Sequence, residues 1–129
     1  MTIRSYRDLI VWQKALELAT DVYRLTMNLP SHETYGLASQ LQRAAVSVPS
    51  NIAEGQARLH PAEFRQFLYH ALGSLAEVDT QLLLAQNLGY LRPDSTMHAE
   101  SLIIELRKMM HTLASRLPGR QSRQLTTHH

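Results

Sequence analysis

The sequence contains no cysteine, and this absence excludes several kinds of chemistry at once. Without a thiol the chain can form no disulfide, no thiolate metal site and no cysteine nucleophile. Glycine and proline are also scarce, with five of each in 129 residues, whereas alanine and leucine are abundant. Because glycine and proline weaken helix interiors, this composition indicates an all-helical chain. The length and the 44% hydrophobic content suit a single domain with one core.

Long apolar runs are missing as well. The longest stretch without a charged residue covers residues 80–91 and includes Gln81, Gln86 and Asn87. It is too short and too polar to span a bilayer. The first eight residues contain no apolar segment of signal-peptide length. We therefore expect a soluble, cytoplasmic protein that makes no contact with a membrane.

Recognisable catalytic motifs are also absent. A di-iron bundle needs Glu-x-x-His pairs, and no histidine of the sequence has a glutamate three positions before it. The sequence has no His-Glu-x-x-His, no glycine-rich phosphate loop and no Gly-x-Ser-x-Gly elbow. Arg65 and His70 match the Arg-x4-His motif of helical HEPN ribonucleases, but on a regular helix they point about 140° apart. These absences predict a non-enzymatic protein with no cofactor, no metal and no small-molecule substrate.

The most informative stretch that is present covers residues 39–55. Its apolar residues recur at the spacing of an amphipathic helix, and a polar stripe with the same period flanks them: Gln40, Arg43, Ser47, Asn51 and Glu54. Such a flank fits the edge of a buried seam, where polar groups pair with a neighbouring helix or subunit. A plain solvent-exposed face is the alternative. In a seam Arg43 would pair with an acid, with Glu54 or Glu77 as candidates.

Hydrophobic periodicity divides the chain into four helices. We expect them over about residues 8–29, 32–57, 61–88 and 95–117, joined by short turns. Pro49 lies in the middle of the second helix, where it removes a backbone donor and predicts a kink unless packing holds the helix. Short connections between long helices favour an antiparallel up-down-up-down four-helix bundle. We assign this bundle to residues 1–118 and a disordered basic tail to residues 119–129.

Two of the helices carry more apolar surface than one bundle can bury. The first has an expected core stripe of Trp12, Ala15, Leu16, Ala19, Val22 and Tyr23, and further apolar residues widen it to about 200° of arc. The third helix has apolar or small residues opposite its core stripe, and Gly73 among them indicates close approach of another backbone. We therefore predict a homo-oligomer whose subunit contacts are these second faces: Val11, Leu18, Leu25, Tyr69, Gly73, Ala76 and Leu84.

Charge is unevenly distributed along the chain. The last 24 residues hold five basic residues and no acidic one: Arg107, Lys108, Arg116, Arg120 and Arg123. Such a basic end predicts weak, non-specific contact with RNA phosphates. The alternative is that lysine and arginine simply favour the C-terminal end of a last helix. Most aromatic residues follow the core stripes, so we expect no platform for base stacking.

Residues spread over the first three helices carry a family resemblance. The first matching segment is Asp8-Leu9-Ile10-Val11-Trp12-Gln13-Lys14-Ala15, and the second, before the polar stripe, is Glu33-Thr34-Tyr35-Gly36-Leu37. It continues with Asn51-Ile52-Ala53-Glu54-Gly55 and Leu88-Gly89-Tyr90-Leu91. Further matching positions lie between these segments: Gln40, Arg43, Ala44, Ala45, Ser47, Glu63, Phe64, Phe67, Leu68, Ala71, Gly73, Ser74 and Glu77. Over about residues 6–91 the sequence resembles the four-helix-bundle family encoded within intervening sequences of bacterial 23S rRNA genes, also labelled S23 ribosomal proteins.

The resemblance implies a pentameric assembly of bundles and no established molecular activity. Distant relatives include the accessory proteins of diversity-generating retroelements, basic pentamers that bind a reverse transcriptase and nucleic acid. In this chain the basic residues are fewer and lie mostly near the C-terminus. We therefore expect a self-assembling scaffold associated with rRNA or a protein partner. A nucleic-acid-binding accessory protein that acts through its basic end is the alternative.

Overall fold

The computed structural model describes residues 5–119, which form four α-helices and three short 3-10 turns, without a strand. Helix α1 covers Ile10–Thr26, α2 covers Leu37–Ala57, α3 covers Pro61–Asn87 and α4 covers Met97–Ser115. The 3-10 turns are η1 at Tyr6–Asp8, η2 at Ser31–Glu33 and η3 at Pro93–Thr96. The expected all-α class with four helices is confirmed. The predicted tail lies outside the described residues from position 120 onward.

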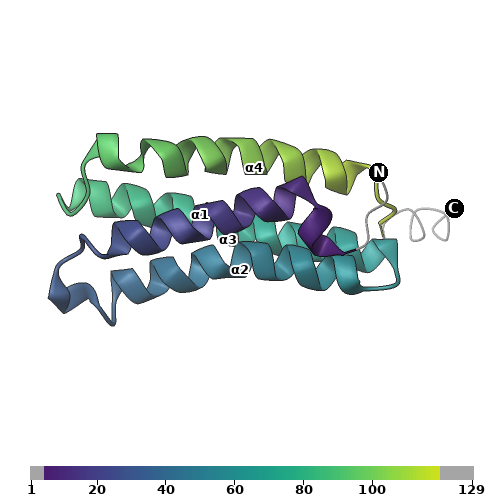
Figure 1. The fold of residues 1–129 in the computed structure, drawn as a ribbon, viewed down its shortest axis with the longest axis horizontal. Coiled ribbons are helices and arrows are strands. Elements are labelled where there is room, and N and C mark those ends of the chain that lie inside the picture. Colours follow the sequence, from purple (N-terminus) through teal and green to yellow (C-terminus); the bar gives the residue numbers. More distant parts are fainter. Residues whose placement is uncertain (1–4, 120–129) are drawn as a thin grey trace, which may run out of the picture.

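The four helices lie side by side in one bundle (Figure 1). Helix α1 contacts α2 and α4, and α3 contacts the same two helices, which places α1 and α3 at diagonal corners. The α1–α2 and α3–α4 connections lie at one end of the bundle (Figure 1). The α2–α3 connection lies at the other end, where α1 begins and α4 ends. None of the helices within residues 5–119 is long and apolar enough to cross a membrane.

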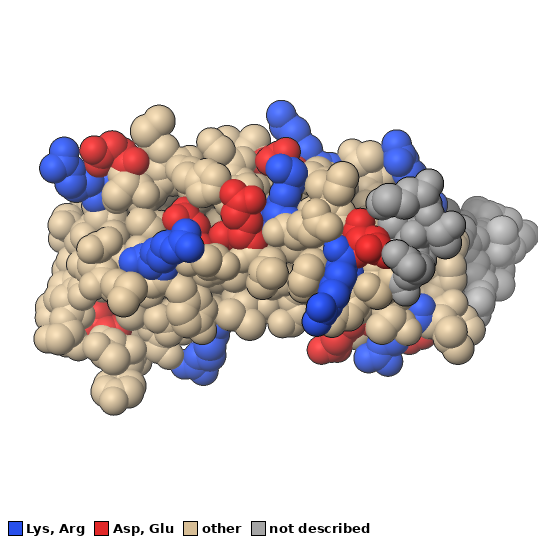
Figure 2. Space-filling view, in the orientation of Figure 1, with Lys and Arg blue, Asp and Glu red and all other residues tan. Residues whose placement is uncertain are grey.

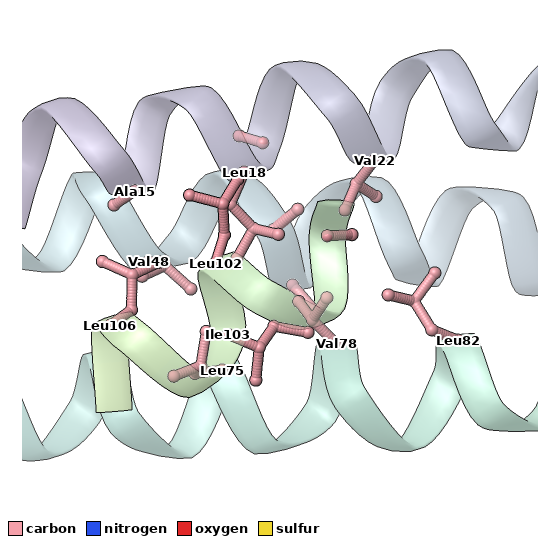
Figure 3. Close-up of a cluster of buried hydrophobic side chains, with 14 of the residues drawn as sticks. Ala15, Leu18, Val22, Val48, Leu75, Val78, Leu82, Leu102, Ile103 and Leu106 are labelled. Atoms are coloured by element: carbon pink, nitrogen blue, oxygen red, sulfur yellow. The ribbon is translucent and has the colours of Figure 1, made fainter. Parts of the chain in front are cut away.

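The core contains buried aliphatic side chains from all four helices, and Figure 3 shows part of it: Leu18, Val22, Val48, Leu75, Val78, Leu82, Leu102, Ile103 and Leu106. Pro49 is also buried, and α2 continues through it to its last turn. One prediction for α1 is wrong. Leu16 and Tyr23, expected in the core, are 46% and 45% exposed, whereas Val11, Leu18 and Leu25 are buried within the chain. The apolar arc of α1 is wider than its buried face, so periodicity alone leaves the rotation of the helix open.

Helix α2 begins at Leu37, later than the start near residue 32 that the sequence predicts. Ser31 instead opens the 3-10 turn η2. Oε1 of Glu33 accepts a hydrogen bond from the backbone N–H of Leu37 at 3.1 Å, so this carboxylate satisfies a free donor of the first helical turn. A Cβ atom at Gly36 would lie 2.7 Å from the same Oε1. The other predicted helix bounds differ from the observed ones by at most three residues.

Glu33 also connects the two turns at this end of the bundle. Its Oε2 accepts a hydrogen bond from the hydroxyl of Tyr90 at 3.0 Å, and Nε2 of His32 lies 3.2 Å from the same hydroxyl. Tyr90 reaches this position after Gly89, whose φ of 77° is a left-handed conformation that favours glycine. The N–H of Leu37 and the Tyr90 hydroxyl lower the pKa of Glu33, and this carboxylate raises the pKa of Tyr90.

Helices α2 and α3 approach each other closely at Gly55. A Cβ atom there would lie 2.6 Å from Cβ of Phe67 and 2.9 Å from Cδ1 of Phe64. Real Cβ atoms do not sit at such distances, and the backbone fixes Cβ of Phe67, so any larger residue must separate the two helices. Glycine at position 55 therefore sets the distance between α2 and α3 at the end near their connection.

We expect Gly55→Ala to destabilise the protein by about 1–3 kcal/mol, because the new methyl group overpacks a closed contact. Denaturant unfolding followed by circular dichroism measures the change. Ser50→Ala, an exposed position on the same helix, is the control and should change stability by less than about 0.5 kcal/mol. Equal stabilities of Gly55→Ala and the control would contradict the close approach.

We expect Tyr90→Phe to raise the pKa of Glu33 toward the ordinary carboxyl value, because the carboxylate loses one donor. The stability that Glu33 contributes is complete above the ordinary carboxyl pKa and is lost as pH falls through its lowered pKa. In the variant that loss should shift to higher pH. Carboxyl-carbon NMR titration measures the pKa of Glu33, and Tyr35→Phe, at a 95% exposed tyrosine, is the matched control. An unchanged pKa in Tyr90→Phe would show that the hydrogen bond is absent in solution.

Candidate functional site

The predicted polar stripe of α2 runs along its seam with α3. Oγ of Ser47 lies 2.6 Å from Oγ of Ser74, which is buried on α3. Nδ2 of Asn51 donates to the carbonyl oxygen of Ser47 at 2.8 Å and to its Oγ at 2.9 Å. Ser47 thus links α2 to α3, and Asn51 supports its hydroxyl from the next turn of α2.

The other half of the stripe lines an open polar cleft of about 310 Å³ between α2 and α3, bounded by Gln40, Arg43, Ala44, Glu77 and Gln81. Nε2 of Gln81 donates to Oε1 of Gln40 at 3.4 Å, the long end of the hydrogen-bond range. Oε1 of Gln81 is buried without a hydrogen-bond partner in the described chain.

Arg43 does not form the ion pair expected of it within the chain. It is exposed, its Nη2 donates to Oγ of Ser39 at 3.3 Å, and it has no acidic partner within residues 5–119. Glu54 pairs instead with Arg58 at 3.9 Å, and Glu77 is exposed. Because Arg43 stands at the outer edge of the seam, water solvates its charge and no desolvation forces a partner on it.

The arginine and histidine of the Arg-x4-His pattern point to different neighbours. Nε of Arg65 donates to the carbonyl oxygen of Ala114 at 3.2 Å, in the last turn of α4, and Nη2 donates to the hydroxyl of Tyr69. The ring of His70 lies 6.0 Å from that of Phe67. Arg65 therefore caps the C-terminal end of a helix, where its charge also suits the helix dipole. Among residues 5–119 no group of three histidine, aspartate or glutamate side chains is placed to hold a metal.

The basic end of the chain is only partly available as a contact surface. Arg107 pairs with Asp79 at 3.5 Å, and Arg120 and Arg123 lie outside the described residues. Lys108 and Arg116 have no ion-pair partner within residues 5–119. Both border a groove of about 530 Å³ between the start of α1 and the end of α4, with an apolar lining of Leu9, Ile10, Val11, Met109 and Leu113. On the face drawn in Figure 2, basic and acidic residues alternate and do not form one basic field.

A long apolar depression follows the boundary between α1 and α2. Two adjoining hollows of about 630 and 270 Å³ share Leu16, Ala19 and Val46. We call this surface the α1–α2 groove and define it by its apolar residues: Tyr6, Trp12, Leu16, Ala19, Tyr23, Met27, Val46, Pro49 and Ala53. Among the described residues that line it, Arg24 is the single charged one. Periodicity alone does not reveal this groove, because it places Leu16 and Tyr23 in the core. The signal for an exposed apolar surface is the apolar arc of α1, which is wider than one buried face needs.

A second apolar surface lies on the outer side of α3, where the sequence predicted it. Tyr69, Leu83, Leu84 and Leu88 are between 45% and 50% exposed. We call this surface the α3 face and define it as Tyr69, Gly73, Ala76, Leu83, Leu84 and Leu88. A Cβ atom at Gly73 would meet nothing within 4 Å, so no backbone of the described chain approaches it. Of the residues assigned to subunit contacts, Tyr69, Gly73, Ala76 and Leu84 are therefore accessible, whereas the three on α1 are buried.

Comparison with known proteins gives one family and one fold. The family model of the 23S rRNA-intervening sequence protein matches residues 7–112. A crystal structure of a protein of unknown function from the S23 ribosomal protein family of Bacteroides thetaiotaomicron is similar to this structure, with a TM-score of 0.73. The two chains are 22% identical, and the match covers 81% of this chain and 98% of that one. No curated protein matches the sequence significantly. Because the family model spans most of the chain, this protein belongs to the 23S rRNA-intervening sequence protein family.

Proposed function

We propose that this protein is a non-enzymatic scaffold that acts by self-assembly. Its antiparallel up-down-up-down bundle would associate into a homo-oligomer, and five copies is the number that the family resemblance implies. The observation that carries this proposal is the pair of apolar surfaces on one small bundle: the α1–α2 groove, with Arg24 as the one charged residue of its described lining, and the α3 face. Monomeric proteins rarely expose contiguous apolar patches of this kind, because each adds a cost of hydration that an interface removes.

The positions that match the family support a structural role. Glu33, Gly36 and Tyr90 hold the turns at one end of the bundle. Gly55 sets the distance between α2 and α3, and Ser47 bonds to α3 across the seam. These side chains are engaged with one another, which leaves them unsuited to bind a substrate. Contacts of this kind within the bundle suit a protein that acts through its shape and its assembly.

We expect several copies of the 14.7-kDa chain in each particle in solution. Light scattering coupled to size-exclusion chromatography measures the molar mass, at protein concentrations from low micromolar upward. A mass five times that of the chain would agree with the family resemblance. A single species at the mass of one chain across this range would overturn self-assembly.

The second candidate function is an accessory protein that binds RNA or a protein partner through its basic end. This alternative depends on Lys108 and Arg116, because neither charge is paired within residues 5–119 and both border the same groove. Contacts of this kind would be with phosphates, and would give affinity without sequence specificity. In an oligomer the basic ends of several copies would act together, and avidity would raise a weak affinity.

We expect the double variant Lys108→Gln, Arg116→Gln to bind single-stranded RNA more weakly than the unaltered protein. The slope of log affinity against log salt should become shallower by about 1.4, because two fewer phosphates are neutralised. Filter binding with unrelated RNAs between about 50 and 300 mM salt measures both quantities. Arg92→Gln, at the other end of the bundle, is the control. If the double variant binds RNA as tightly as Arg92→Gln does, Lys108 and Arg116 take no part in the contact.

A further inference from the structure

The α1–α2 groove and the α3 face belong to different sides of the bundle. The rotation of α3 is fixed because Ser74 faces α2 and Asp79 faces α4, where it pairs with Arg107. The α3 face lies on the remaining outer side, away from both neighbours. Since α1 and α3 occupy diagonal corners, the core separates the α3 face from the groove. Within one chain the two surfaces cannot meet.

The two surfaces match in shape and length. The groove is a furrow between two helices, whereas the α3 face is the ridge of one helix. At 1.5 Å per residue, the groove runs for about 22 Å along α1 from Trp12 to Met27, and the α3 face runs for about 28 Å from Tyr69 to Leu88. Gly73 and Ala76 make the half of the ridge nearer Tyr69 low, which allows another backbone to come close there.

The charges around the two surfaces are also compatible. The residues that define the α3 face are all uncharged, and two charged residues of the same helix border it. Arg65 lies over the ring of Tyr69 and donates to Ala114 and Tyr69, whereas Glu77 has no ion pair in the described chain. The single charged residue that lines the groove is Arg24, which also lacks an ion pair within residues 5–119. Joining the surfaces therefore offers the unpaired Glu77 to Arg24, while Arg65 is already engaged with Ala114 and Tyr69 of its own chain.

We propose that the α3 face of one copy of this chain docks into the α1–α2 groove of the next copy. The proposal rests on the proposed self-assembly and names the surfaces that carry it. Each copy then offers two different surfaces, one to each neighbour, which is a heterologous contact. Repetition of such a contact closes into a ring when the rotation between copies allows it. A two-fold contact of the groove with a second groove is the competing arrangement.

The test uses one disruptive variant on each surface. Leu16→Glu places a charge in the groove, and Leu84→Glu places the same charge on the α3 face; both side chains are about half exposed, so the fold accommodates the change. Leu59→Glu, at a 93% exposed position outside both surfaces, is the matched control. Circular dichroism and thermal unfolding establish that each variant is folded, and Tyr23→Glu with Leu83→Glu is a second pair.

Each surface variant alone should run as a single chain, and the control should assemble as the unaltered protein does. The mixture of Leu16→Glu with Leu84→Glu should give a 1:1 pair with twice the mass of one chain. In that pair, the intact groove of the Leu84→Glu copy holds the intact α3 face of the Leu16→Glu copy. The double variant, which lacks both surfaces, should bind neither partner.

The outcomes separate this inference from the proposed function. If the unaltered protein is monomeric, both the proposed self-assembly and the docking of these two surfaces are wrong. If the unaltered protein assembles and the surface variants assemble equally well, self-assembly stands and the docking of these two surfaces is wrong. Assembly of Leu84→Glu together with loss of assembly in Leu16→Glu would indicate the groove-to-groove contact and overturn the head-to-tail arrangement. Monomeric variants whose mixture forms no pair would overturn it as well.

Discussion

The close packing of α2 against α3 is the constraint on which the rest of the bundle depends. Gly55 lets Phe64 and Phe67 lie directly on α2, and the bond between Ser47 and Ser74 sets how α3 is rotated. Once Ser74 faces α2, no helix within residues 5–119 covers the apolar residues on the far side of α3. The same contact that builds the monomer therefore leaves an apolar ridge in water, and burial of that ridge would favour association.

The loops at the opposite end have a complementary structural role. Glu33 caps α2 and accepts a hydrogen bond from Tyr90, so one carboxylate joins the α1–α2 and α3–α4 connections. Both connections lie within the residues that the family model matches. These contacts hold the bundle together, whereas the surfaces that we propose for assembly lie elsewhere on the helices.

The sequence predicted the helices and the outer face of α3 because polar or small residues on α3 separate its two apolar sides. It did not predict which half of α1 is buried. The apolar arc of that helix includes both Leu18 and Leu16, so several rotations of the helix would bury apolar side chains. Periodicity placed the start of α2 near residue 32, but Glu33 and Gly36 move the start of the helix to Leu37. The solvation of Arg43 depends on the depth of the seam, a tertiary feature that spacing along one helix does not contain.

The central claim, that the α1–α2 groove is covered by another copy, is tested most directly by the oxidation of two methionines. Met27, in the groove, is 84% exposed in one chain, and Met97, at the start of α4 and outside both surfaces, is 63% exposed. Oxidation by dilute peroxide depends on exposure, and peptide mass spectrometry gives the rate for each sulfur. We expect Met27 to be oxidised more slowly than Met97 in the assembled protein. In the Leu84→Glu variant, Met27 should be oxidised faster than it is in the assembled protein. Rates for Met27 that are the same in both proteins would contradict it.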